Sequence, residues 1–274
     1  MAFRINTNVD ALNGSRQLGI TQALVSQNLA RLASGSRINS AADDAAGLAI
    51  SEILNTQIRG ANQAAANAQD GISLIQTADG ALSQTADSLQ RIRELTVEAG
   101  NGTLSPEQRG AIQSEIADIQ QSIDQTANNT QFNGLPLLNG TNTSVTLQTG
   151  PNSGNTNTVN LPNATTAALG IGPGQVDVSS PAAANASLSN IDQAIDRVNT
   201  ARGDLGAQSN ALQNVTATLN VSSENQASAR SRIADLDYAQ AITQQTRDSI
   251  LSDLNAAVLA HANLNSQGVL RLLG

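Results

Sequence analysis

The chain has 274 residues and a net charge of −8, with 22 acidic residues against 14 basic ones. This balance disfavours nucleic acid and anionic membrane surfaces as partners, because both attract proteins mainly through Lys and Arg. Aromatic residues make up 1% of the chain and there is no Cys, which disfavours an aromatic-lined enzyme pocket and excludes a disulfide or a thiolate metal site.

The first residues contain no apolar run of the kind that a secretory signal needs. No stretch of about 18 apolar residues occurs either, so we expect no membrane-spanning segment. An extracellular role would therefore require a dedicated exporter that acts without a cleaved signal peptide.

Two helices are predicted in the first hundred residues. The first, from Val9 to Leu32, carries a stripe that recurs every seven residues and consists of Ala11, Leu18, Val25 and Leu32. Ser40 to Asp43 has the pattern of a capping box for the second helix, predicted from about Ala45 to Glu98. The stripe of this second helix consists of Ala61, Ala68, Ile75, Leu82 and Leu89. At about 1.5 Å per residue such a helix is roughly 80 Å long, which favours a rod.

A third helix is predicted to begin with Ser105 as its N-cap and Pro106 in its first turn. Residues 128–181 are then rich in Gly, Asn, Thr, Ser and Pro, and two alternating segments within 144–161 predict a β-hairpin. Helical periodicity resumes near Leu188 and continues to about Ser223, and a last helix is predicted from about Ile233 to Leu264.

The two halves of the chain mirror each other about this middle segment. Folding at the midpoint would bring the two terminal helices side by side. The predicted fold is therefore mainly α: a long antiparallel helical coiled-coil rod with a small β-hairpin region near the chain midpoint, whose termini form a paired-helix inner domain.

Several long segments, in the same order along the chain, resemble bacterial flagellin. At the N-terminal end they are residues 29–47, 67–73, 89–95 and 131–134. At the C-terminal end they are residues 228–233, 237–239 and 258–263. The resemblance implies a terminal inner domain of residues 1–42 and 235–274 and a rod-like domain of residues 43–178 and 179–234. The outer domains that larger members insert in the middle are essentially absent.

The resemblance also implies a function and partners. The chain would be a structural subunit that polymerises with copies of itself into the extracellular flagellar filament, for motility. A flagellar export chaperone, the filament cap and the hook junction proteins are implied as further partners, and an innate-immune receptor as a possible one. No cofactor, metal, nucleic acid or membrane is expected, and no enzymatic activity.

The residues expected to drive polymerisation are apolar residues of the terminal helices, interpreted as one narrow seam on each helix. They are Leu12, Leu18, Val25, Leu29 and Leu32 in the first helix, and Ile250, Leu254, Val258 and Leu264 in the last. Burying a Leu-sized side chain contributes roughly 1.5–3 kcal/mol, whereas ordering each residue costs roughly 1–2 kcal/mol. The two terminal helices alone do not break even, so we expect them to become ordered on assembly. The apolar tail from Val269 to Gly274 would be exposed on a monomer.

Other candidate sites have simpler interpretations. His261 is the only His and is expected to be a plain helix-face residue, because a metal site needs several ligands. Asp235 and Asp237 are interpreted as helix-start acids, not as a catalytic pair. Arg91, Leu95 and Glu115 match the positions that make flagellins recognisable to the immune receptor; they are also expected to be rod-surface residues that pack against neighbouring subunits.

Three other functions compete with the filament subunit. The nearest alternative is the hook–filament junction protein, which resembles flagellin at both ends but forms only a thin ring. A secreted enzyme is a remote alternative, since no nucleophile–base pair or metal set supports it. A cytoplasmic coiled-coil scaffold is a third, and finding the chain outside the cell would exclude it.

Overall fold

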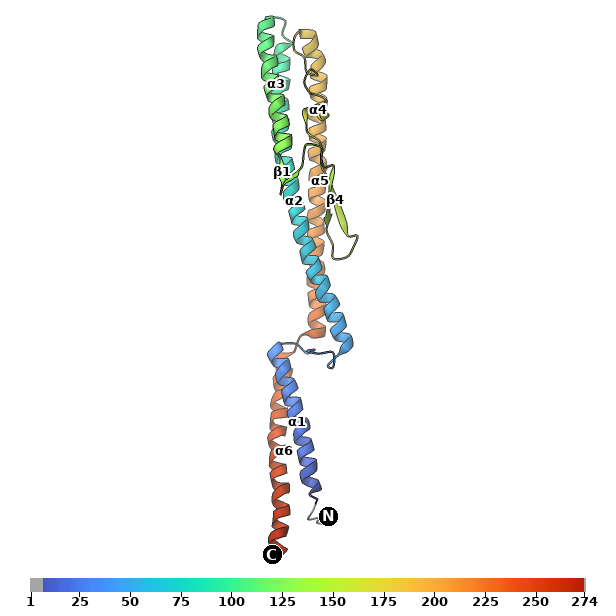
Figure 1. Ribbon diagram of the computed structural model, residues 1–274, viewed down its shortest axis with the longest axis vertical. Helices are drawn as coiled ribbons and strands as arrows, with labels where there is room; N and C mark the ends of the chain where they lie inside the picture. The colour runs from blue at the N-terminus through green and yellow to red at the C-terminus, as the bar shows by residue number, and fades with distance from the viewer. Residues whose placement is uncertain (1–6, 274) are drawn as a thin grey trace. The chain divides into compact units, whose positions relative to one another are not determined.

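The computed structural model describes residues 7–273, with side chains described as far as Leu264. The chain separates into two compact units. The first contains the two ends of the chain, up to Thr56 and from Asn225 onward, and the second contains the residues between them. Helices predominate and two small antiparallel sheets lie in the second unit, which confirms the predicted mainly α class (Figure 1).

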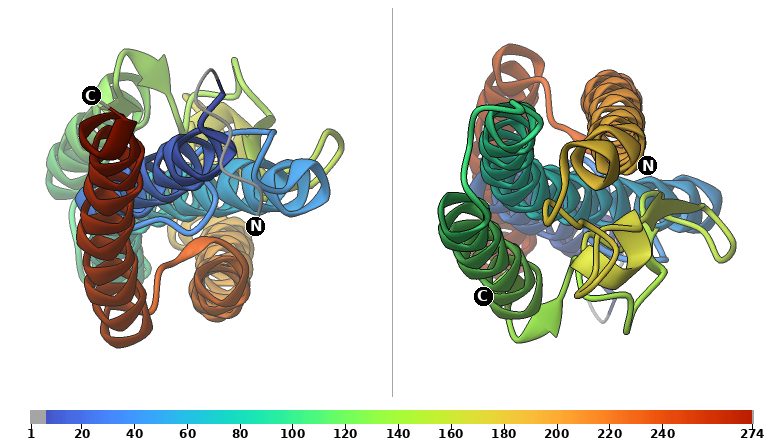
Figure 2. Two further views of the ribbon diagram at one scale, coloured as in Figure 1. Left: turned by 90° about the horizontal axis from the view of Figure 1, so that it is seen from below. Right: turned by 90° about the horizontal axis from the view of Figure 1, so that it is seen from above.

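The first unit is built around α1 (Val9–Ser34) and α6 (Tyr238–Leu273), which lie side by side and run antiparallel (Figures 1 and 2). Helix α1 begins at the cap Asn8, whose side chain accepts a 2.9 Å hydrogen bond from the N–H of Ala11. It ends at Gly35, whose φ of 68° is the left-handed conformation in which Gly commonly stops a helix. The predicted pairing of the terminal helices is therefore present.

The capping box predicted at Ser40 does not form. Instead, the carboxylate of Asp44 caps α2 (Ala45–Ala99) and accepts a 2.8 Å bond from the N–H of Gly47. The side chain of Ser40 donates to Asp43, so it has no role at the helix start. The predicted start of α2 near Ala45 is confirmed, but the predicted cap lies a whole turn before the actual one.

The second unit contains most of α2, together with α3 (Pro106–Asn129) and most of α5 (Pro181–Ala234) (Figure 2). The predicted sevenfold stripe of α2 is buried, and so is the matching stripe of α5. The α5 stripe consists of Ile191, Val198, Leu205, Leu212 and Leu219. The capping box at Ser105 is confirmed, with both of its hydrogen bonds present. These apolar seams form one large core cluster and a smaller separate one that contains Ala61 and Leu219.

The predicted boundaries of α5 and α6 were wrong at both ends of each helix. Helix α5 begins at Pro181, seven residues before the predicted start, and continues to Ala234 instead of ending near Ser223. Its first turn is rich in Ala, a strong helix former that carries little apolar periodicity. Helix α6 begins at Tyr238, because Asp237 caps it and accepts bonds from two backbone N–H groups. The apolar tail predicted at 269–274 lies outside the described side chains.

The predicted hairpin is confirmed as β3 (Ser144–Gln148) paired with β4 (Thr156–Asn160). A smaller hairpin was not predicted: β1 (Gln131–Phe132) pairs with β2 (Leu135–Pro136) across Asn133 and Gly134. Both turn residues have positive φ, which Asn-Gly accommodates well, so this pair was the signal that could have revealed the turn. A short helix, α4 (Thr166–Leu169), follows β4.

The β3–β4 hairpin packs closely on α2. A Cβ added at Gly71 would overlap the side chain of Leu147 and would lie 3.1 Å from Cδ1 of Leu212. Nearby, the Asn67 amide donates a 2.9 Å bond to the carbonyl of Gln148. The absence of a side chain at Gly71 therefore allows the hairpin to approach the helix.

We expect Gly71→Leu and Gly80→Leu to change stability in opposite directions. Both would gain about 0.5–1 kcal/mol of helix propensity. Nothing lies within 4 Å of a Cβ at Gly80, so this variant should be stabilised. At Gly71 the new side chain would displace Leu147, and such overpacking costs about 1–3 kcal/mol. Urea unfolding followed by circular dichroism would measure both; equal shifts in the two variants would contradict the close packing of the hairpin.

Candidate functional site

The interface between α1 and α6 is largely polar or made of small residues. The positions of α1 that face α6 are spaced alternately by three and four residues: Ala11, Gly14, Leu18, Thr21, Val25, Asn28 and Leu32. Those of α6 follow the same spacing: Ala241, Gln245, Asp248, Ser252, Asn255, Leu259 and Ala262. All are buried or half-buried in the pair. Apart from Leu259, the positions on α6 contribute no large apolar side chain.

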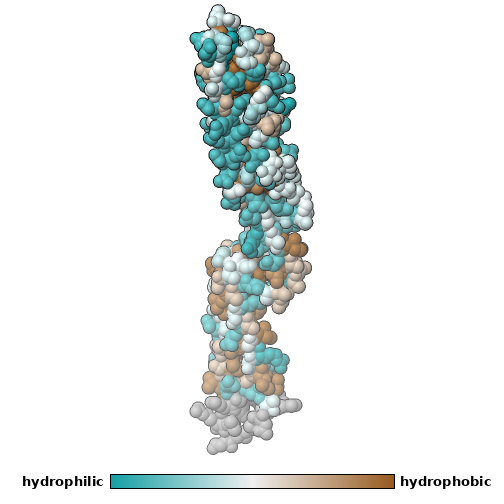
Figure 3. Space-filling model, turned by 45° about the horizontal axis from the view of Figure 1, so that its top comes forward, coloured by the Kyte–Doolittle hydropathy of each residue, from teal (hydrophilic) through white to brown (hydrophobic). Residues whose placement is uncertain are grey.

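The outward faces of the same two helices carry large apolar side chains. On α1 the exposed ones are Val9, Leu12, Ile20, Leu24 and Leu29. On α6 they are Ile242, Ile250, Leu251, Leu254, Val258 and Leu264. Hydrophobic residues are visible over these helices in the space-filling view, whereas hydrophilic residues predominate over the other unit (Figure 3). This is the reverse of a stable isolated coiled coil, and large exposed apolar surfaces mark interaction sites.

The interpretation of each apolar set as a single seam was wrong. Leu18, Val25 and Leu32 do face α6, but Leu12 and Leu29 lie on the outer face of α1. The four residues expected on α6 are all on its outer face; Leu254, for example, is 55% exposed. The inward positions of α6 were missed because they are mostly polar, and a search for apolar periodicity does not detect them.

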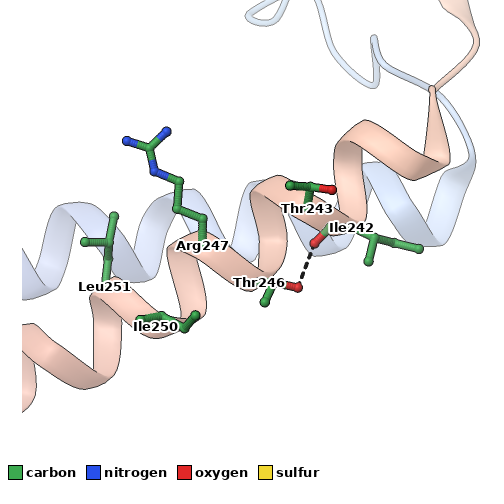
Figure 4. Close-up of a pocket in the computed structure, with 6 residues that line it drawn as sticks. All are labelled: Ile242, Thr243, Thr246, Arg247, Ile250 and Leu251. Atoms are coloured by element: carbon green, nitrogen blue, oxygen red, sulfur yellow. Dashed lines mark hydrogen bonds between the residues drawn. The ribbon is translucent and has the colours of Figure 1, made fainter.

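A shallow groove runs along the outer face of α6 (Figure 4). Its lining residues all come from this helix: Ile242, Thr243, Thr246, Arg247, Ile250 and Leu251. The hydroxyl of Thr246 donates a 2.9 Å bond to the carbonyl of Ile242, so this donor is already satisfied within the helix. The groove therefore offers an apolar surface with one cation, Arg247, beside it.

The loop between α1 and α2 is held against α1 by Asp43. Its carboxylate accepts a 2.9 Å bond from Arg31, a 2.8 Å bond from Gln27, and bonds from the N–H groups of Asn39 and Ser40. The hydrogen bond from Arg31 is the main cause that lowers the pKa of Asp43 far below its ordinary value, and the bond from Gln27 is the next. The carboxylate thus stays ionised in mild acid.

Replacing Asp43 by Asn should release this loop. The pKa of Asp43 is lower in the folded protein than in the unfolded chain. The ionised carboxylate therefore stabilises the folded state fully above the ordinary Asp pKa of about 3.9, and this stabilisation is lost as the pH falls toward the lowered pKa. In Asp43→Asn at neutral pH, we expect amide exchange over residues 36–44 to be about tenfold faster. Hydrogen-exchange mass spectrometry of the folded protein would measure it, with the exposed Asp253→Asn as control. Unchanged exchange in Asp43→Asn would contradict the role of this carboxylate.

The three residues matched to the immune receptor occupy different environments. Arg91 is exposed and pairs with Glu115 at 2.8 Å and with Glu94 at 3.3 Å, and both acids raise its pKa, Glu115 the more. Leu95 is 2% exposed and belongs to the core. A partner could therefore contact Arg91 and Glu115 directly, whereas Leu95 could act only by supporting them.

The remaining candidates occupy positions that indicate structural roles. His261 is exposed on α6, and among the described residues no three His, Cys, Asp or Glu side chains are grouped so as to hold a metal ion. Asp237 caps α6, as its interpretation as a helix-start acid predicted. For Asp235 that interpretation was wrong, because this residue forms an isolated β-bridge with Ser36 before the cap. None of the helices in the described part combines the length and apolar character that crossing a membrane requires.

Fold and surface together define a class: helical proteins whose paired terminal helices keep a polar seam and present apolar faces outward. Comparison with known proteins gives the family. The model of the bacterial flagellin N-terminal helical region matches residues 5–143, and that of the C-terminal helical region matches residues 188–273. The chain therefore belongs to the bacterial flagellin family and is a structural subunit of the flagellar filament.

Individual flagellins are similar in sequence to nearly the whole chain. Flagellin FlaB2 of Treponema pallidum is 41% identical, with 98% of this chain and 99% of the relative covered. A flagellin of Bacillus subtilis is 39% identical, with 99% and 100% covered. Among solved structures, Bacillus cereus flagellin is 30% identical with a TM-score of 0.51, covering 56% of this chain and 88% of that one.

Proposed function

We propose that the chain polymerises through the outward faces of α1 and α6, which neighbouring copies cover in the filament. The observation that supports this most strongly is the distribution of exposed large apolar side chains. Among the described side chains, the only exposed large apolar ones in the second unit are Val97 and Val221. All other exposed large apolar side chains of the described part lie in the first unit, mostly on α1 and α6. Surfaces of this kind are stable when a partner excludes water from them.

The free energy of burying the exposed apolar side chains is similar in size to the cost of association. A large apolar side chain that is already half-buried gains roughly 1 kcal/mol when the rest of it is buried. The two helices expose 11 such residues, Tyr238 not counted. The gain is then of order 10 kcal/mol, within the range of about 4–15 kcal/mol that association costs in lost freedom of motion. Contacts of the second unit would supply the surplus that makes a filament persist.

The finer organisation follows from the same surfaces. We assign residues 1–42 and 235–274 to an inner domain that holds the polymer together, and residues 43–178 and 179–234 to a rod-like domain. The chain would act through these surfaces and not as a catalyst. The family is one of structural proteins.

Location and partners complete the proposal. Because this chain is a subunit of the flagellar filament, we place it outside the cell. An export chaperone and the filament cap would contact the apolar faces before they are buried, and the hook junction proteins would contact them at the filament base. The exposed pair of Arg91 and Glu115 is the surface that an innate-immune receptor would contact.

Assembly of the purified chain tests the function. We expect filaments many times longer than one subunit in negative-stain electron microscopy, and sedimentation of most of the protein at high speed. Assemblies that stop at short rings would instead favour the hook–filament junction protein. Protein that stays in the supernatant at every concentration, with or without filament seeds, would contradict a polymerising subunit.

A further inference from the structure

Two hydrogen bonds between side chains cross the interface of α1 and α6, seven residues apart on each helix. The amide of Asn28 donates a 2.6 Å bond to Oδ2 of Asp248. Seven residues further along each helix, in opposite directions, the amide of Asn255 donates a 2.9 Å bond to Thr21. The equal spacing means that both pairs belong to one antiparallel register.

Asp248 is the most polar member of this seam and lies within it. It is 2% exposed, and its second oxygen accepts a 2.9 Å bond from Gln244 on its own helix. Both carboxylate oxygens thus have a donor, and α1 supplies one of them. A buried carboxylate is tolerated only while such donors are in place.

A shift of one helix along the other would remove the donor from α1. The seam positions on either side of Asn28 are Val25 and Leu32, so a slip of one turn would place an apolar side chain opposite Asp248. Apolar seams tolerate such slips, because one Leu packs nearly as well as the next. A polar residue at a single seam position excludes them, at a cost in stability.

We propose that Asp248 determines the register of α1 against α6, and thereby aligns the outward apolar faces of the two helices for polymerisation. The inference rests on the proposed polymerisation surfaces for its consequence in assembly, but not for its effect on register. The polar residues weaken the pairing of α1 with α6, but they allow only one register. A mispaired subunit would present its apolar side chains in positions that neighbouring copies do not match.

Disulfide trapping reports the register directly, because the chain has no Cys of its own. A Cβ at Gly14 would lie 3.6 Å from Cβ of Leu259, within the range of about 3.5–4.5 Å that a disulfide requires. Gly14→Cys with Leu259→Cys traps the native register. Leu18→Cys with Ala262→Cys traps a register slipped by one turn, in which Leu32 lies opposite Asp248. Oxidation captures transient pairing, so the yields are compared in the free full-length subunit.

We expect the native cross-link to exceed the slipped one by at least about tenfold in the parent chain, and the two yields to become similar in Asp248→Leu. Asn28→Asp combined with Asp248→Asn keeps an Asp–Asn pair with the roles exchanged, and it should restore the preference. A preference unchanged in Asp248→Leu would overturn the proposal, and so would a failure of the exchanged pair to restore it.

Filament growth separates this proposal from the function on which it rests. We expect Asp248→Leu to raise the critical concentration for growth by at least about tenfold, although its seam is more apolar and its monomer is at least as helical by circular dichroism. The exchanged pair should grow at nearly the parent concentration. If the register preference is lost while growth is unchanged, Asp248 still sets the register, and polymerisation through the outward faces is contradicted.

Discussion

Replacing Ile250 and Leu254 together by Ser is expected to prevent filament growth at concentrations where the parent chain assembles. The two side chains are 56% and 55% exposed and lie one turn apart on the outward face of α6. Completing the burial of each contributes roughly 1–1.5 kcal/mol, so the double variant should lose about 2–3 kcal/mol per subunit. Since about 1.4 kcal/mol is a factor of ten, the critical concentration should rise roughly thirty- to hundredfold.

A matched control tests whether position matters more than hydrophobicity. Val221 is 58% exposed, but it lies in the second unit. Val221→Ser also removes an exposed apolar side chain, and it should leave the critical concentration within about threefold of the parent. Sedimentation after seeding would measure all three proteins. If the double variant and the control behaved alike, the outward face of α6 would have no special role in growth.

The second large effect concerns the free subunit, in which we expect the helices of the first unit to be much less stable than those of the second. The seam between α1 and α6 is mostly polar or small, so pairing buries little apolar area against the roughly 1–2 kcal/mol per residue that ordering the chain costs. Helix α2 has a continuous apolar seam that includes Leu82 and Leu89. Amides of α1 and α6 should exchange at least about a hundredfold faster than those near Leu89.

Assembly should abolish this difference. In filaments, neighbouring copies would supply the missing contact area, and exchange in α1 and α6 should slow to a rate close to that of α2. Hydrogen-exchange mass spectrometry on monomer and sheared filament would compare the two states. Helices that are already protected in the monomer would show that the pair is stable alone. A chain limited to residues 43–234 that still built filaments would show that the terminal helices are dispensable.

Much of the fold was predictable because it depends on large apolar residues at regular spacing. The stripe through Leu82 and Leu89 predicted α2 to within a residue at its C-terminal end, and Ser105 with Pro106 predicted the start of α3. The strands of the larger hairpin alternate as expected. The start of α5 at Pro181 was missed because its first turn is rich in Ala and shows little apolar periodicity.

The candidate site was predictable in location but not in orientation. Apolar content and resemblance both pointed to the terminal helices. Periodicity alone assumes that apolar residues face inward, however, and here the inward positions include Thr21, Asn28 and Asp248. The outward placement of Leu12, one residue from the seam position Ala11, required the packed structure. Leu95 shows the reverse case, a residue expected on the surface that lies in the core.

Polymerisation through α6 requires that the outward face of this helix is open in the subunit and covered in the filament. The chain has no Cys, so a single Leu254→Cys substitution gives a unique probe of that face. We predict that a maleimide reacts with it in the free subunit as with an exposed thiol, and at least about tenfold more slowly after assembly. Equal reaction rates in monomer and filament would contradict polymerisation through this face.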